Sequence, residues 1–184
     1  MLIITLSGIH ARAAIISCIT AFPLILLLSI AAYAGDATAD SAKKQKMIEM
    51  FEEYKKEAFS DVPDITVEQI KNDSGKGYII VDTREKKEQN VSMIPGAITQ
   101  KEFEKNKKKY KGKAIVTYCT IGYRSGVYAK KLNKKGFKAY NLVGGVLSWA
   151  HEGNEFVCDS ANTKKVHVYG KDWDLAPERY KTTW

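Results

Sequence analysis

The chain has 184 residues, of which 45% are hydrophobic and 27% are charged, a composition that suits one globular domain with extensions. It carries 29 basic and 21 acidic residues, which gives a formal net charge of +8 at pH 7. The lysines are scattered over several predicted helices and loops, and no nucleic-acid-binding motif accompanies them, so we expect solvated helix faces and no nucleic-acid partner. Such a positive field can still concentrate small anions near a site.

The first 34 residues resemble a secretory signal peptide. Residues 13–34 are almost wholly apolar, Arg12 precedes them, and Ala32-Tyr33-Ala34 forms a small-residue exit. We therefore expect cleavage after Ala34, export to the periplasm, and no contribution of residues 1–34 to the fold. The apolar run approaches membrane-spanning length, so a retained signal anchor facing outside the cytoplasm is the alternative. Cleavage would remove one arginine and no acidic residue, lowering the net charge to +7.

A leader and one amphipathic helix are expected over residues 35–64. Residues 35–41 are small and polar, which is typical of a flexible leader. Residues 42–59 then show apolar side chains at helical spacing among charged ones, and we expect this stripe to pack against the domain. The apolar positions are Met47, Phe51, Tyr54 and Ala58. We expect Thr66 to begin a further short helix, with Gln69 three residues on as a capping-box partner.

Strands and helices alternate through the next part of the chain. Apolar runs over 77–82 and 113–117 predict buried strands of the kind that parallel sheets use, and 137–142 is expected to be the next strand. A charged helix over 102–110 lies between the first two, and a second helix after the Cys119 strand ends at Gly136. Gly144-Gly145 makes a tight turn into a short last helix. This order implies an α/β fold with a mainly parallel sheet and helices on both faces.

Cys119 stands at the carboxyl end of the 113–117 strand, before a turn that opens a helix. Ligands bind at this edge of an open α/β sheet, and such a turn can aim several backbone N–H groups at one anion. A thiol in that cradle should ionise more readily. Arg124, five positions later, adds a planar positive charge suited to an oxyanion. The competing interpretation of Cys119 taken alone is a small buried core residue.

The tail over 154–184 contains the second cysteine of the expected mature chain, Cys158. An oxidising compartment allows a disulfide between Cys119 and Cys158, either permanent or reversible, and a permanent bridge would silence the nucleophile. One strand-like run, 165–169, lies in the tail, and Tyr180 and Trp184 are expected to anchor it. The three histidines show no metal-ligand spacing, so we expect neither metal nor cofactor.

Four sequence pieces together resemble the rhodanese-like sulfurtransferases, over residues 65–153. They are Val81-Asp82-Thr83-Arg84-Glu85, Ile94-Pro95-Gly96-Ala97, Cys119-Thr120-Ile121-Gly122-Tyr123-Arg124-Ser125, and Gly144-Gly145 with Trp149. One position departs from the pattern, because Ser92-Met93 stands where the family usually has Gly-His before Ile-Pro-Gly-Ala. We expect that departure to affect the local loop more than the chemistry.

The resemblance implies that Cys119 carries a persulfide. Backbone N–H groups of Thr120, Ile121, Gly122, Tyr123, Arg124 and Ser125 would then cradle the sulfur, and Arg124 is implied as an anion contact. Asp82 and Arg84 match a family pair that we interpret as structural support. Related phosphatases and arsenate reductases have a loop one residue longer, whereas four residues separate Cys119 from Arg124 here, as in the sulfurtransferases.

The expected activity is sulfur transfer from an anionic donor such as thiosulfate to a thiol or other thiophilic acceptor, including an acceptor protein. Three alternatives stay open: a non-catalytic persulfide carrier or binding module outside the cytoplasm, thiol–disulfide redox work by Cys119 with Cys158, and phosphatase or arsenate reductase chemistry. A membrane partner is expected only if the N-terminal segment is retained.

Overall fold

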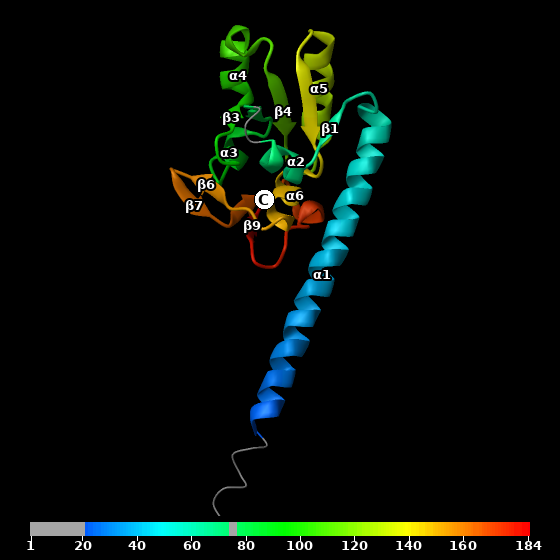
Figure 1. The fold of residues 1–184 in the computed structure, drawn as a ribbon, viewed down its shortest axis with the longest axis vertical. Coiled ribbons are helices and arrows are strands. Elements are labelled where there is room, and N and C mark those ends of the chain that lie inside the picture. Colours follow the sequence, from blue (N-terminus) through cyan, green and yellow to red (C-terminus); the bar gives the residue numbers. More distant parts are fainter. Residues whose placement is uncertain (1–20, 74–76) are drawn as a thin grey trace, which may run out of the picture. The chain divides into compact units, whose positions relative to one another are not determined.

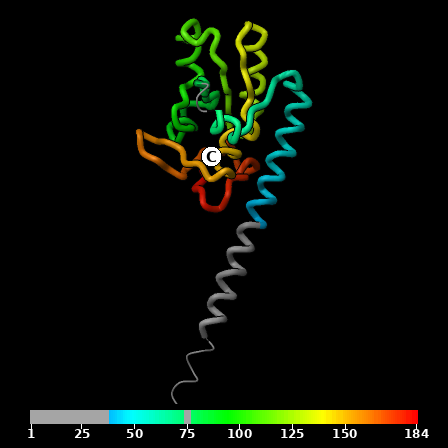
Figure 2. Tube along the Cα trace, viewed as in Figure 1, coloured from blue at the N-terminus to red at the C-terminus, as the bar shows by residue number. Residues whose placement is uncertain are grey.

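The computed structural model describes the backbone of residues 21–73 and 77–184, and the side chains of 38–73 and 77–184 (Figures 1 and 2). The chain divides into two compact units, Met1–Thr38 and Ala39–Trp184, and the second holds the sheet and the candidate site. Most of the expected signal segment lies outside the described residues. Among those that are described, no helix has the length and apolarity needed to cross a membrane.

Helix α1 runs from Ala21 to Ala58 without a break. The prediction of a flexible leader over 35–41 is therefore wrong, whereas the predicted helix over 42–59 is present as the end of α1. Six of the residues from 31 to 42 are alanine, the best helix former. Their propensity offsets the cost of about 1 kcal/mol for one glycine, Gly35, inside a helix.

The five-stranded sheet of the second unit is parallel throughout, which confirms the predicted fold class (Figure 1). Its spatial order is β1-β5-β4-β2-β3, so β4 lies at the centre. Val116 of β4 pairs with Ile80 on one side and Tyr140 on the other. The strands are β1 (Asp64–Ile65), β2 (Ile79–Asp82), β3 (Ile98–Thr99), β4 (Ala114–Tyr118) and β5 (Lys138–Leu142).

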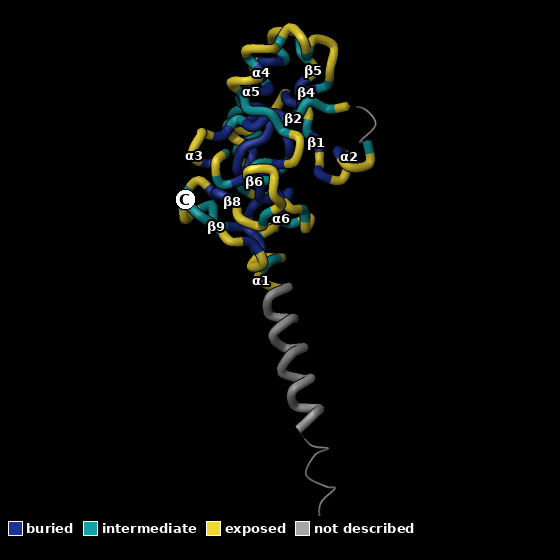
Figure 3. The backbone as a smooth tube through the Cα atoms, turned by 90° about the vertical axis from the view of Figure 1, so that its left-hand side faces the viewer, coloured by how far each residue is buried: buried dark blue, intermediate teal, exposed yellow. Residues whose placement is uncertain are grey.

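Helices cover both faces of this sheet, and each face has its own hydrophobic cluster. Side chains alternate along β4, so Ile115 packs in one cluster with Phe103 and Leu132, while Val116 packs in the other with Ile70 and Leu147. Figure 3 shows these buried segments enclosed by exposed loops. The helices are α2 (Val67–Asn72), α3 (Lys86–Gln89), α4 (Gln100–Asn106), α5 (Tyr123–Lys134) and α6 (Gly145–His151), with a 3-10 turn η2 (Lys107–Tyr110).

The capping box predicted for the short helix after Thr66 is present at the start of α2. The Thr66 hydroxyl accepts from the Gln69 amide at 3.1 Å, and the Gln69 side chain accepts from the Thr66 amide at 2.8 Å. These two bonds satisfy backbone donors that a helix start otherwise leaves unpaired. The local prediction was possible because both partners lie three residues apart in the sequence.

The C-terminal tail forms two small sheets and a 3-10 turn. Strands β6 (Phe156–Cys158) and β7 (Ala161–Thr163) are antiparallel, and β8 (Lys165–His167) pairs in parallel with β9 (Lys181–Thr183). The turn η3 spans Lys171–Trp173. Phe156, Val166, Val168, Leu175 and Tyr180 are buried in the cluster on the α6 face. Trp184 is 59% exposed, so the expectation that it anchors the tail is wrong.

Ser92 and Met93 are points of attachment for the tail. The Ser92 hydroxyl donates to the Lys165 carbonyl at 2.7 Å, and Met93 forms an antiparallel bridge with Val157. The pair that departs from the family pattern is thus the pair that holds β6 and β8. Both contacts join the loop before Ile94 to the tail.

Candidate active site

Cys119 begins the loop that joins β4 to α5. The Gly122 amide donates to the Cys119 Sγ at 3.2 Å, and the Ser125 hydroxyl lies 3.5 Å from the same sulfur. Ser125 also donates to the Asn141 side chain at 2.7 Å, and Asn141 in turn donates to the Gly122 carbonyl at 2.9 Å. The Gly122 amide is therefore the donor to the sulfur, because the single Ser125 hydroxyl proton goes to Asn141, and only 2% of Cys119 is exposed.

The start of α6 holds the backbone of this loop from behind. The Val146 amide donates to the Cys119 carbonyl at 3.0 Å, and the Leu147 amide donates to the Thr120 carbonyl at 3.3 Å. A side chain at Gly145 would place its Cβ 2.2 Å from the Cys119 carbonyl oxygen, so only glycine permits this approach. The Gly144-Gly145 motif therefore allows the start of α6 to come close enough to hydrogen-bond the loop carbonyls.

The C-terminal part of α1 packs directly beneath the loop. A Cβ at Gly122 would lie 2.6 Å from the Phe51 ring, and a Cβ at Gly126 would lie 2.6 Å from the Phe59 ring. Both phenylalanines are fully buried. Phe51 belongs to the predicted amphipathic stripe, so the stripe contacts the active loop at Gly122, while Phe59, just after α1, contacts Gly126 of α5.

Asp82 and Arg84 form a buried ion pair at the end of β2. The Arg84 guanidinium donates to the Asp82 carboxylate at 2.7 and 3.0 Å, and it also donates to the Ser92 carbonyl at 2.6 Å. The Tyr118 hydroxyl donates to Asp82 at 2.7 Å and accepts from the Ile94 amide at 3.2 Å. Burial raises the pKa of Tyr118 well above its ordinary value, and the Asp82 carboxylate raises it further. The pair therefore joins β2 to the residue that precedes Cys119.

Glu88 holds Arg124 in a two-pronged ion pair. The guanidinium donates to both Glu88 carboxylate oxygens at 2.7 Å, and the Glu88 side chain has no solvent exposure. Burial raises the pKa of Glu88, but the hydrogen bonds from Arg124 and from the Glu85 amide outweigh it and leave that pKa below its ordinary value. Arg124 is 28% exposed and already paired, so its contact with an anion stays a prediction.

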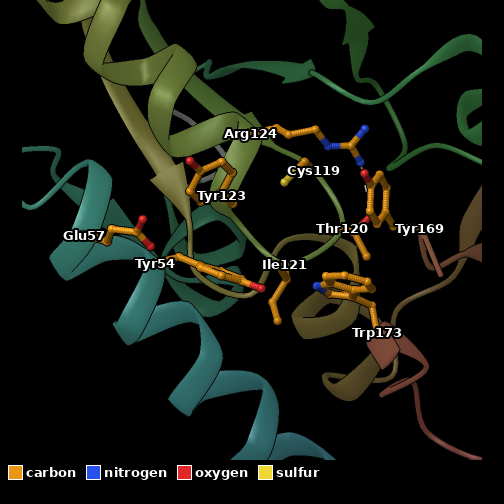
Figure 4. Close-up of a pocket in the computed structure, with 9 residues that line it drawn as sticks. All are labelled: Tyr54, Glu57, Cys119, Thr120, Ile121, Tyr123, Arg124, Tyr169 and Trp173. Carbon is orange, nitrogen blue, oxygen red and sulfur yellow. Dashed lines mark hydrogen bonds between the residues drawn. The ribbon is translucent and has the colours of Figure 1, made fainter. Parts of the chain in front are cut away.

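A pocket of about 420 Å³ opens over the loop (Figure 4). Its lining includes five of the loop residues singled out in the sequence, Cys119, Thr120, Ile121, Tyr123 and Arg124. Gly122 and Ser125 are not among the lining residues and contact the sulfur from behind. The buried thiol is thus part of a pocket wall and is not enclosed in the core.

Four further lining residues were not anticipated from the sequence. Tyr54 and Glu57 come from α1, and Tyr169 and Trp173 come from the tail. Packing on the domain was the only role that the sequence suggested for the two extensions, and the structure adds residues from both to the pocket lining. A signal existed for Tyr54, which was recognised in the apolar stripe, but nothing local in the sequence connects Tyr169 or Trp173 with Cys119.

Tyr169 is held over Arg124 by its neighbours. Its backbone has a positive φ of 65°, which is unusual for a residue with a bulky side chain, and its amide donates to His167 Nδ1 at 3.1 Å. The Arg124 guanidinium lies 5.0 Å from the Tyr169 ring centre, and Trp173 packs edge-on against the same ring at 5.1 Å. His167 is buried, and burial lowers its pKa.

Cys119 and Cys158 are both free thiols, so the permanent disulfide considered above is absent from the structure. Cys158 lies on β6, where its sulfur is 3.5 Å from the Asn90 carbonyl oxygen, and it does not line the pocket. Within the described residues, no cluster of three or more His, Cys, Asp or Glu side chains is placed to hold a metal ion.

Comparisons with known proteins bear on the same part of the chain. The family described as "Rhodanese-like domain" matches residues 66–152. A "tRNA sulfurtransferase" of Desulfurococcus amylolyticus is 33% identical over 108 residues, covering 59% of this chain and 21% of that protein. A "tRNA uridine(34) hydroxylase" of Buchnera aphidicola is 29% identical over 132 residues, covering 58% of this chain and 42% of that protein.

A third relative is matched over most of its length. The Bacillus subtilis protein named "Putative sulfurtransferase YtwF" is 36% identical over 76 residues, which are 40% of this chain and 74% of that protein. The two tRNA enzymes, by contrast, are matched over less than half of their own length. The chain therefore spans less than half of the length of these two relatives.

Proposed function

Because this chain belongs to the rhodanese-like domain family, we propose that it is a sulfurtransferase in which Cys119 carries a sulfane sulfur as a persulfide. The donor is an anion such as thiosulfate, and the acceptor is a thiophile. The family and its sulfurtransferase members support sulfur transfer in general. The donor and the persulfide step are our proposal for this chain.

The observation that carries the proposal is the placement of the Cys119 sulfur in a pocket wall, with the Gly122 amide donating to it. Behind it, the first-turn amides of α5, Tyr123, Arg124 and Ser125, have no backbone acceptor among the described residues. Unpaired amides at the positive end of a 12-residue helix attract an anion. They favour both a charged donor and the charged persulfide.

The reaction proceeds as two displacements on sulfur. The Cys119 thiolate attacks the outer sulfur of thiosulfate, the S–S bond of the donor breaks, and its electron pair leaves with sulfite. The persulfide anion formed on Cys119 then presents its terminal sulfur to the acceptor. Attack by a thiolate or cyanide breaks the Cys119 S–S bond and restores the thiolate. The loop orients the Cys119 sulfur, and its amides donate hydrogen bonds without having to rearrange.

Mass spectrometry of the protein after incubation with thiosulfate tests the proposal. We expect one added sulfur atom on the parent chain and on Cys158→Ser, and none on Cys119→Ser. Cyanide should remove the added sulfur as thiocyanate. Equal sulfur on the parent and on Cys119→Ser would move the chemistry away from the loop and refute the assignment.

Steady-state turnover distinguishes an enzyme from a carrier that is loaded once. We expect repeated turnover of thiosulfate with cyanide, because both half-reactions use the same pocket. A single stoichiometric burst of thiocyanate would instead support the carrier interpretation.

We also propose that the protein acts outside the cytoplasm, on the sequence pattern of residues 1–34. N-terminal sequencing of the protein from cell fractions checks this proposal. A mature chain that begins at Gly35 supports a cleaved signal peptide, and an intact N-terminus in the membrane fraction supports an anchor. An intact N-terminus in the cytoplasmic fraction would contradict both.

A further inference from the structure

The pocket over Cys119 is larger than an inorganic sulfur donor requires. Its volume of about 420 Å³ falls within the range of sites for small organic molecules, roughly 300–1,000 Å³. Four aromatic side chains form much of the pocket wall: Tyr54, Tyr123, Tyr169 and Trp173. Figure 4 shows them on opposite sides of the space below Cys119. Three of these four rings lie outside the segment that matches the family.

The charge of this wall is negative. Two of the lining residues are charged, Arg124 and Glu57. Arg124 is neutralised by its two bonds to Glu88, and one ring face of Tyr169 already lies on it. Glu57 is exposed and has no hydrogen-bond or ion-pair partner among the described residues. A carboxylate beside several aromatic faces attracts a cation and disfavours a second anion.

We propose that the acceptor in the second half-reaction is a low-molecular-weight organic thiol that carries an ammonium group. Its ammonium lies near Glu57 and the tyrosine faces, while its sulfur reaches the persulfide on Cys119. This inference rests on the proposed function and names the substrate class of its second step. The loop amides bind the anionic donor, and the lining residues of α1 and the tail bind the cationic acceptor.

The transfer step balances without a further reactant. The acceptor thiolate attacks the terminal sulfur of the Cys119 persulfide, and a new S–S bond forms on the acceptor. The S–S bond to Cys119 breaks, and its electron pair stays on Cys119 as the thiolate. The products are an organic persulfide anion and the enzyme ready for another donor.

Three thiols of similar size test the proposal: cysteamine, 2-mercaptoethanol and 3-mercaptopropionate, with thiosulfate as donor. The measured quantity is the ratio of kcat/KM for cysteamine to kcat/KM for 3-mercaptopropionate, each expressed per thiolate. We expect the parent protein to prefer cysteamine, with 2-mercaptoethanol between the two. We expect Glu57→Gln to reduce the ratio about 5-fold, the upper range for a solvent-exposed ion pair.

Two control variants distinguish the loss of the Glu57 charge or of a lining ring from general destabilisation. Glu53→Gln lies one turn earlier on α1 and is exposed, and Trp184→Ala removes an exposed ring outside the pocket. Both should keep the parent ratio. Tyr54→Leu, which removes the lining ring one turn before Glu57 on α1, should lower kcat/KM for cysteamine about 10-fold relative to Trp184→Ala, in line with the loss of one cation–π contact.

The outcomes separate the two proposals. If thiosulfate and cyanide turn over but Glu57→Gln keeps the parent ratio, or the parent prefers 3-mercaptopropionate, the acceptor class is wrong and the sulfurtransferase proposal stands. If the parent turns over with cyanide and with no thiol, an acceptor protein replaces the small thiol. If Cys119 takes up no sulfur from thiosulfate, the proposed function fails and this inference fails with it.

Discussion

Glu88 carries a charge at a position with no solvent exposure, and Arg124 is the partner that makes this possible. Replacing Glu88 by Gln leaves the guanidinium with weaker acceptors. Breaking a fully buried pair costs about 3–5 kcal/mol, and we expect about 2 kcal/mol here because Arg124 is 28% exposed. Urea unfolding of Glu88→Gln measures the loss, with Glu53→Gln as the exposed control. An unchanged midpoint would show that the pair adds nothing to stability.

The same carboxylate predicts a dependence of stability on pH. Burial raises the pKa of Glu88, but its hydrogen bonds to Arg124 lower it more, so the folded chain binds this proton less readily than the unfolded chain. The contribution is complete above the unfolded pKa, about 4.3, and is lost as the pH falls through the folded pKa. We expect the unfolding free energy of the parent to fall more steeply than that of Glu88→Gln below pH 5. Parallel curves would contradict this.

Sequence reasoning at the residue scale found Cys119, Arg124, Asp82 and Arg84 but not Glu88. The first four stand in spaced patterns at strand ends, where chemistry is expected. Glu88 lies in a stretch with several charged residues, and Glu85 or Lys87 carries as much local signal. Only the fold identifies Glu88, because α3 brings its carboxylate against Arg124 and Thr120 of the Cys119 loop.

At the scale of elements, the contact between α1 and the active loop depends on Gly122. Its φ of 118° disfavours any side chain, and a Cβ would meet the Phe51 ring at 2.6 Å. We expect Gly122→Ala to lower sulfur loading of Cys119 at least about 10-fold, because a shift of the order of 1 Å in the loop misplaces the sulfur. Loading is measured by mass spectrometry.

Gly136, at the other end of α5, provides the matched control. It also has a positive φ, 80°, but a Cβ there would meet no atom within 4 Å. Gly136→Ala should cost about 1 kcal/mol of stability through backbone strain alone and leave sulfur loading intact. If both variants lose loading equally, the effect comes from general destabilisation and not from the Phe51 contact.

Most elements of the sheet were predictable because their signals are local. The strand before Cys119 is a run of apolar and β-branched residues, and the strand over 138–142 follows shortly after Gly136, which marks the end of α5. The two-residue strand β1 and the four-residue helix α3 were missed because they are too short to show a period. In the tail, the predicted strand-like run over 165–169 contains β8, whereas its pairing with β9 and the short β6–β7 hairpin were not predicted.

At the scale of the whole molecule, the second compact unit begins at Ala39, after the predicted cleavage site. The buried α1 residues Met47 and Phe51 lie within this unit. We therefore expect a chain that begins at Gly35 to show the same unfolding free energy in urea, within about 0.5 kcal/mol, and the same turnover as the full chain. A lower midpoint would show that residues 1–34 contribute to the fold.

The hydrogen bonds that hold the active loop reduce the reorganisation needed when Cys119 takes up sulfur. The carbonyls of Cys119 and Thr120 are already committed to the α6 amides, so the peptide planes of the loop are oriented before any substrate arrives. When the outer atom of the persulfide appears, little reorganisation of dipoles is required, which lowers the barrier in the way that preorganised sites do. Loaded and empty forms should therefore share one backbone conformation.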